Sequence, residues 1–347
     1  MSYKKNKTMR RGAAAGIAAV LVATGVPTGT AFAAGGAHVA AATAGKHFVL
    51  GSVVDDMTNP FLSVLAQGEK QEAAKLGMTV KVVSGNVSGS ISMSAQVAAV
   101  QQFISQHVSA ILMTTSDSSG IVPVIKQANA AGIPVVAVNT PVGTVTGNTV
   151  NTNGAKVVTF VGANNYTYGV AEGQLVVQAL GGKGNVAMIH GTLGTEPDTL
   201  RFQGIKSVFA KYPGIHVITT KSDNWQNSAN ISVVQDLLAQ YHGNQLNAVV
   251  ATGPEMYAGA EYARSHGNKT IKFIAGDYSK QVQAAIKSGA LYGTVDQSPA
   301  QQGEMGAQYA YDYLTGKRSA IPTPISYTPL PLITAKNVNQ VPATWSS

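Results

Sequence analysis

The 347-residue sequence contains no cysteine. A disulfide bond, a thiolate metal site and a cysteine nucleophile are therefore excluded, and so is a lipid anchor on an N-terminal cysteine. The chain is also poor in charge, because charged residues make up only 12% of it while hydrophobic residues make up 45%. That balance is typical of a folded globular protein and argues against an intrinsically disordered one.

Acidic residues are missing from the first 33 positions, which hold five of the basic residues. The formal net charge of +8 therefore falls to +3 for the rest of the chain. Nucleic-acid-binding proteins usually carry a concentrated basic face, so this small excess predicts no nucleic-acid partner.

The N-terminus has the pattern of a signal peptide at residues 1–33. A basic stretch ending at Arg11 precedes the apolar run Ala13–Ala23, which is too short to span a bilayer. Small residues flank Phe32 and predict cleavage after Ala33. Residues 34–45 read as a flexible leader, and we expect a soluble mature protein in the periplasm. The Arg10-Arg11 pair leaves twin-arginine export open beside ordinary secretion.

Short β-rich runs alternate with helical segments from His47 onward. Several runs are continuously apolar, such as Ala110–Met113, which indicates strands buried on both faces of a parallel sheet. The ten expected strands are 47–54, 79–83, 110–114, 134–139, 157–161, 185–190, 215–220, 248–252, 271–275 and 292–295. The nine expected helices are 60–76, 93–107, 118–131, 168–180, 198–212, 230–241, 255–266, 281–288 and 301–314.

This alternation predicts an α/β fold, and ten strands suit two doubly wound parallel-sheet lobes better than one open sheet. The expected first lobe comprises residues 46–158 and 298–325, and the second comprises 159–297 and 326–340. Three crossovers would join them, near 157–162, 295–299 and 321–328. Residues 321–331, which include the last of these crossovers, carry four prolines and read as extended chain.

Ligands of open α/β sheets bind at the carboxyl ends of the strands, so the residues that follow the strands are candidates for a site. Several of them are carboxylates, amides or arginine, which exchange hydrogen bonds with hydroxyl groups. Two are aromatic and offer flat apolar faces to a sugar ring. The candidates are Asp55, Asn59, Phe61, Asn139, Thr140, Arg201, Trp225, Asp277 and Gln297.

Each candidate also has an ordinary structural explanation. Phe61 after Asn-Pro suits a hydrophobic contact at a helix start, and Trp225 suits half-buried packing in a loop. Arg201 could lie on a helix surface, and Asp277 could cap the next helix. Their shared position after sheet strands favours a common binding site.

Four stretches carry a resemblance to a known family. They read GSVVDDMTNPFLSVLAQGEKQEAAKLG, AGIPVVAVNT, GNVAMIHGTLGTEPDTLRFQGIKSVF and FIAGDYSKQVQAAIKSGALYGTVDQSPAQQGEMG. In order and spacing, residues 47–334 resemble the ribose- and galactose-type periplasmic sugar-binding proteins. The resemblance implies a two-lobed protein that closes on a small neutral sugar or polyol and delivers it to an ABC permease, as a monomer without a cofactor or metal. It also implies first-lobe contacts from Asn59 and Phe61, with Asp55 as a further candidate. From the second lobe it implies contacts from Arg201, Trp225 and Asp277, and it implies an amide ligand, Gln297, at a lobe crossover.

The sequence departs from that family at three places. Asn139-Thr140 stands where many members have Asp-Arg, and Gly253-Pro254-Glu255 stands where they often have Asn-Asp before a helix. Leu62 replaces a second ring-stacking phenylalanine. The reduced polar set suits a ligand with fewer hydroxyls, a smaller ring or a linear polyol. An acidic ligand would be opposed by the carboxylates.

The sequence also bears on three other functions. A sugar-responsive transcription regulator needs a DNA-binding headpiece, and a signal peptide takes that place. The sequence has no nucleophile elbow, histidine metal cluster or phosphate-binding glycine loop, so we expect no enzyme activity. A receptor that reports a sugar-derived signal to a chemoreceptor or sensor kinase stays open beside uptake.

Overall fold

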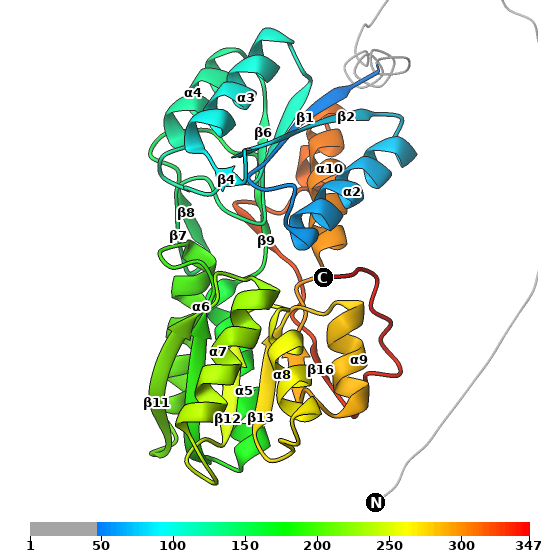
Figure 1. Cartoon of the computed structure of the whole chain (residues 1–347). Coiled ribbons are helices and arrows are strands. Elements are labelled where there is room, and N and C mark those ends of the chain that lie inside the picture. The colour runs from blue at the N-terminus through cyan, green and yellow to red at the C-terminus, as the bar shows by residue number, and fades with distance from the viewer. Residues whose placement is uncertain (1–46) are drawn as a thin grey trace, which may run out of the picture. The chain divides into compact units, whose positions relative to one another are not determined.

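The computed structural model describes residues 47–347, which belong to one compact unit with two six-stranded sheets. Helices cover both faces of each sheet, so the unit consists of two lobes of similar construction (Figure 1). The expected signal peptide and leader, residues 1–45, lie outside the described residues. Among residues 47–347, none of the helices combines the length and the apolar character that crossing a bilayer requires.

The first lobe is built on a sheet whose strands are all parallel, in the order β15-β9-β6-β5-β1-β2. Its strands are β1 (Val49–Val54), β2 (Thr79–Ser84), β5 (Ala110–Met113), β6 (Val135–Val138), β9 (Phe160–Gly162) and β15 (Ile325–Tyr327). Its helices are α2 (Pro60–Lys75), α3 (Met93–Ser105), α4 (Val122–Ala130) and α10 (Pro299–Leu314). Helices α2 and α10 pack on one face, and α3 and α4 pack on the other.

The second lobe has the sheet order β11-β10-β12-β13-β14-β16. Its strands are β10 (Lys183–His190), β11 (Gly214–Ser222), β12 (Ala248–Ala251), β13 (Lys272–Gly276), β14 (Gly293–Val295) and β16 (Leu332–Thr334). Its helices are α5 (Asn165–Leu180), α6 (Glu196–Phe209), α7 (Asn227–Gln240), α8 (Met256–Ser265) and α9 (Lys280–Ser288). Helices α5 and α6 pack on one face, and α7, α8 and α9 pack on the other. Strand β16 pairs antiparallel with β14, so this sheet is not wholly parallel.

Strand β5 explains why the apolar runs of the sequence become central strands. Ala110 and Leu112 join the core beneath α2 and α10, while Ile111 and Met113 join the core beneath α3 and α4. Successive side chains of a strand point to opposite faces, so a strand buried on both faces needs an apolar residue at every position. The fold class predicted from the sequence is therefore confirmed, apart from the antiparallel β16.

The lobe boundaries differ from the expected ones. The structure pairs β9 with β6 and β15, so this strand belongs to the first lobe, and the first crossover follows Gly162. The whole of β15 also lies in the first sheet, which moves the third crossover to residues 328–331. A hydrophobic run after a polar loop resembles the start of a new sheet, and its pairing partner is set by tertiary contacts that local pattern does not reveal.

The expected helices and strands are present with shifted ends. Helix α5 begins at Asn165, three residues earlier than expected, because the Asn164 side chain accepts a hydrogen bond from the Thr167 N–H. The sequence did not predict two short hairpins, β3 (Asn86–Val87) with β4 (Ser90–Ile91) and β7 (Thr144–Thr146) with β8 (Thr149–Asn151).

Candidate ligand-binding site

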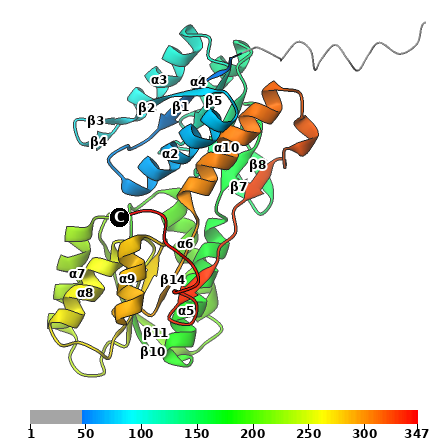
Figure 2. The same cartoon turned by 90° about the vertical axis from the view of Figure 1, so that its right-hand side faces the viewer.

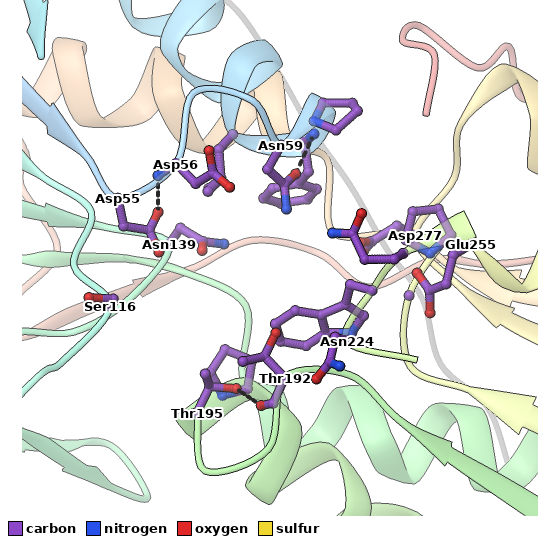
Figure 3. Close-up of a pocket in the computed structure, with 18 of the residues that line it drawn as sticks. Asp55, Asp56, Asn59, Ser116, Asn139, Thr192, Thr195, Asn224, Glu255 and Asp277 are labelled. Atoms are coloured by element: carbon purple, nitrogen blue, oxygen red, sulfur yellow. Dashed lines mark hydrogen bonds between the residues drawn. The ribbon is translucent and has the colours of Figure 1, made fainter. Parts of the chain in front are cut away.

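A cavity of about 610 Å3 lies between the lobes. Most of the residues that line it follow the carboxyl ends of strands in both sheets, where open α/β folds place their ligands. Figure 3 shows Asp55, Asn59 and Asn139 on one side of it and Glu255 and Asp277 on the other. All nine residues singled out from the sequence line this cavity, although whether each touches a ligand stays a prediction.

The loop from β1 to α2 supplies the first group. The Asn59 side-chain oxygen accepts from the Phe61 N–H at 2.9 Å, and Pro60 starts the helix, so Asn59 is a standard helix cap. Because the cap uses only the oxygen, the Asn59 amide nitrogen has no partner in the described structure and can donate to a ligand. Burial raises the pKa of Asp55 to about 6. Phe61 both lines the cavity and packs into the first-lobe core, so its expected core contact is present and its contact with a ligand stays a prediction.

Asn139 and Thr140, at the end of β6, differ in how many of their side-chain hydrogen-bonding atoms remain available to a ligand. The Thr140 hydroxyl accepts from the Thr115 N–H at 2.8 Å and donates to the Thr115 carbonyl oxygen at 2.8 Å. Asn139 donates from its amide nitrogen to Gln302 at 3.0 Å, and its carboxamide oxygen has no partner in residues 47–347. Thr140 therefore holds two loops together, and Asn139 is the better acceptor for a ligand hydroxyl.

Arg201 reaches the cavity from α6 and is only 4% exposed. Its Nε donates to Asn165 at 3.0 Å, its Nη1 donates to the Thr252 carbonyl at 2.7 Å, and its guanidinium lies 4.0 Å from the centre of the Tyr168 ring. These contacts fix the guanidinium in one orientation. A guanidinium has five N–H donors, so it can still donate to ligand oxygens after making these bonds.

Asp277 and Gln297 belong to a hydrogen-bonded chain that runs between the lobes. Gln297 Nε2 donates to Asp277 Oδ1 at 2.8 Å, and the Tyr168 hydroxyl donates to the same oxygen at 3.1 Å. Gln302, at the start of α10, donates to the Gln297 carbonyl at 2.9 Å and accepts from Asn139. The chain connects the second-lobe residue Asp277 to the first-lobe residue Asn139 and leaves Asp277 Oδ2 for a ligand.

The charge of Asp277 depends on its surroundings. Burial raises its pKa to about 6, although the Arg201 guanidinium and the Gln297 amide work in the opposite direction. The carboxyl group is therefore ionised at neutral pH and can accept a hydrogen bond from a ligand hydroxyl.

Trp225 lies in the loop after β11, and its indole ring fits there only because two neighbouring residues are glycines. A Cβ atom at Gly191 would collide with the indole ring, and one at Gly253 would come within 2.7 Å of Trp225 Cδ1. Trp225 Nε1 is buried, and no hydrogen-bond partner for it lies in residues 47–347. Gly253, one of the departures from the family pattern, therefore makes room for the indole beside the cavity.

Glu255 is a cavity residue that the sequence marked only as a departure. It is 2% exposed, and neither carboxyl oxygen meets a hydrogen-bond partner within residues 47–347. Burial and the nearby carboxylate of Asp223 raise its pKa well above the usual range. A Cβ atom at Gly253 would collide with this carboxyl group, so the same glycine admits Glu255 and Trp225 together.

Several lining residues have strained backbones. Asn139, Asn224, Trp225 and Asp277 all have positive φ angles, between 52° and 65°. Such conformations are costly for residues with side chains and persist where the surrounding structure enforces them, often at functional sites. Of the eight non-glycine residues with positive φ angles in residues 47–347, four line this one cavity, in keeping with the prediction of a functional site there.

Residues 50–318 match the model of a family described as the periplasmic binding protein domain. The chain belongs to this family. The ribose import binding protein RbsB of Bacillus subtilis is 31% identical over 273 residues, which span 79% of this periplasmic binding protein and 84% of the relative. The xylitol-binding protein of Mycolicibacterium smegmatis is 28% identical over 76% of this chain and 74% of its own.

Solved structures agree with the fold of this periplasmic binding protein. A solute-binding protein of Agrobacterium vitis, bound with alpha-D-tagatopyranose, has a TM-score of 0.73 and 28% identity over 84% of this chain and 96% of its own. A protein from Bacillus halodurans with bound myo-inositol has a TM-score of 0.72 over 85% of this chain and 96% of its own. The latter is 23% identical, so it supports the fold alone.

Proposed function

We propose that the protein binds a small neutral sugar or polyol between its lobes and delivers it to the permease of an ABC importer. The observation that carries this proposal is the convergence of the polar and aromatic strand-end residues of both lobes on one cavity. Relatives named for ribose import and xylitol binding support the same ligand class. Export to the periplasm and a monomeric state complete the proposal.

In the proposed binding mode, each lobe offers half of the site. Asp55, Asn59 and Asn139 on the first lobe, and Arg201 and Asp277 on the second, exchange hydrogen bonds with ligand hydroxyls. A ligand that contacts both halves favours the closed arrangement by its differential affinity for that state. Closure removes water and strengthens the hydrogen bonds inside the cavity.

The charges around the cavity favour a neutral ligand. Among the described residues that line the cavity, Arg201 carries the only basic group, against the carboxyl groups of Asp55, Asp56, Glu196, Glu255 and Asp277. An anionic ligand would meet this excess of carboxyl groups at close range. Hydroxyl groups suit the site better, because they can donate to carboxylates and accept from the guanidinium.

A thermal-shift screen tests the ligand class. The panel contains D-ribose, D-allose, D-tagatose, L-arabinose, xylitol and myo-inositol, with glucuronate as an acidic control. A ligand present at 100 times its dissociation constant stabilises the folded protein by about 2.7 kcal/mol, which raises the melting temperature. The proposal would be contradicted if glucuronate alone raised the melting temperature, or if no compound of the panel raised it.

The membrane protein that responds to the sugar-loaded form distinguishes uptake from sensing. The proposal predicts that the sugar-loaded protein stimulates the ATPase activity of a reconstituted cognate permease and that the sugar-free protein stimulates it less. Binding without catalysis predicts that chromatography recovers the sugar unchanged after prolonged incubation. Stimulation of a sensor kinase in place of the permease would favour the receptor alternative.

A further inference from the structure

The last residues of the chain return to the cavity after the final strand. Beyond β16 the chain runs along the second lobe beside α9 and ends between the lobes (Figure 2). Trp345 and Ser347 line the cavity. This stretch lies outside residues 50–318, which match the family model. We call residues Pro342–Ser347 the C-terminal strap.

The strap is hydrogen-bonded to the start of α9 on the second lobe. The Lys280 N–H donates to the Trp345 carbonyl oxygen at 2.8 Å. The Gln281 side chain donates to the Ser347 carbonyl at 2.7 Å and accepts from the Ser347 N–H at 3.0 Å. The Ser279 and Ser347 hydroxyls lie 2.7 Å apart. Four polar contacts therefore fix the strap to one lobe, three of them through the strap backbone.

The Trp345 side chain belongs instead to the first lobe. The indole is 4% exposed and lies in the cluster formed by α2, α10 and the first sheet. Its ring meets Phe61 edge to face, with 5.9 Å between the ring centroids. Every other buried residue of that cluster comes from the first lobe. One six-residue segment thus carries a polar attachment to one lobe and an apolar attachment to the other.

We propose that the C-terminal strap is a positioning element of the ligand site, in which Trp345 braces Phe61 and holds the two lobes together around the cavity. Hinge opening has to break either the contact with the first lobe or the hydrogen bonds at α9, because the strap spans both. The strap therefore adds to the stability of the arrangement that offers both half-sites at once. A ligand binds more tightly when the competent arrangement is more populated before binding.

The test for movement of the lobes needs no ligand. Because the chain has no cysteine, Ala130→Cys on α4 and Ala239→Cys on α7 give one spin label on each lobe, both at exposed positions. Double electron–electron resonance on the sugar-free protein is expected to give a longer and broader distance distribution after Trp345→Ala. Truncation after Thr344, which removes residues 345–347, is expected to have the same effect. Gln281→Ala, which loosens the other attachment, should act in the same direction.

The affinity test rests on the proposed function and uses the panel sugar that gives the largest thermal shift. Trp345→Ala is expected to weaken its binding about tenfold or more, mainly through faster dissociation. Trp345→Phe, which keeps an aromatic contact with Phe61, should restore most of the affinity. Ser346→Ala is the matched control, because Ser346 is exposed in the same segment.

The outcomes separate the two proposals. A changed distance distribution with no sugar bound by any form would support the strap and contradict sugar binding. Unchanged distances and unchanged affinity after truncation would overturn the strap and leave sugar binding intact. Equal losses from Trp345→Ala and Trp345→Phe, with normal circular dichroism, would also overturn the bracing role, because the phenylalanine contact would not have rescued it.

Discussion

The two lobes share one construction but bring different chemistry to the cavity. On the first lobe, Asp55, Asn59 and Asn139 are half-buried and make few side-chain hydrogen bonds. On the second lobe, Arg201 and Asp277 are nearly fully buried and are held by several partners each. The second half-site is preorganised, whereas the first retains side-chain freedom.

This difference indicates that the two lobes contribute differently to affinity and to specificity. Removing one member of a buried and bonded group leaves its partners unpaired, which costs more than losing a solvated contact. We therefore expect the second lobe to contribute most of the affinity. The first lobe departs from the family pattern at Asn139 and Thr140, and we expect it to determine the specificity among sugars.

The largest expected effect follows from Asp277→Ala. The substitution removes an acceptor from the ligand and from the Gln297 and Tyr168 donors, so binding should weaken by roughly 2–4 kcal/mol. Isothermal titration calorimetry measures the change, and Asp277→Asn is the matched control that keeps an oxygen acceptor. Unchanged affinity in the alanine variant would remove Asp277 from the site.

Trp225→Ala should have the next largest effect. It removes the aromatic face on the second lobe, and we expect a loss of roughly 1–2 kcal/mol in binding free energy. Trp225→Phe should retain much of the affinity because it keeps a flat ring. Both tryptophans, Trp225 and Trp345, line the cavity, so the fluorescence change on adding sugar should shrink in the alanine variant by the part that Trp225 contributes. An unchanged fluorescence response would place the ligand away from Trp225.

Acid should weaken binding through one carboxyl group on each lobe. Burial raises the pKa of Asp55 and of Asp277 to about 6. A ligand hydroxyl donates to the ionised form, so affinity is full above pH 7 and falls as the pH drops through 6. The loss should reach up to about tenfold per pH unit for each carboxyl group that takes up a proton. Calorimetry between pH 5 and 8 on Asp55→Asn and Asp277→Asn separates the two lobes, and a flat profile in the wild type would contradict both assignments.

Two neighbouring residues of the first lobe give the smallest and sharpest contrast. Thr140→Val breaks two hydrogen bonds to Thr115, so it should lower folding stability by about 1 kcal/mol and leave affinity nearly unchanged. Asn139→Ala should do the reverse and reduce affinity more than stability. Melting temperature and dissociation constant are measured on both variants. Loss of affinity in Thr140→Val would give Thr140 the direct role that its hydrogen bonds argue against.

The sequence predicted the fold well because the signal is local and repeated. A run such as Ala110–Met113 can serve only as a strand that is apolar on both faces, and Pro60 after Asn59 predicts the start of α2. The same alternation located the strand ends and so the nine residues that line the cavity. Which lobe β9 joins depends on its pairing with β6 and β15, and local pattern carries no information about that pairing.

The parts of the site that the sequence missed depend on long-range contacts. Glu255 reaches the cavity because Gly253 has no side chain, a relation that appears only when both are placed next to Trp225. Trp345 lies 284 positions after Phe61 in the chain, and no pattern in the sequence links them. The sequence likewise does not reveal that the Thr140 hydroxyl is hydrogen-bonded to Thr115.

The left-handed backbone at Asn139, Asn224, Trp225 and Asp277 has a consequence for the engineering of this protein. Glycine adopts such angles without steric cost. At the exposed residue Asn224, glycine would therefore relieve backbone strain at little packing cost while deleting a side chain that lines the cavity. At Trp225 and Asp277 glycine would instead leave a void or unpaired donors, so the lost packing and hydrogen bonds outweigh the relieved strain. Among these four positions, a selection for thermal stability alone is expected to reach Asn224 first.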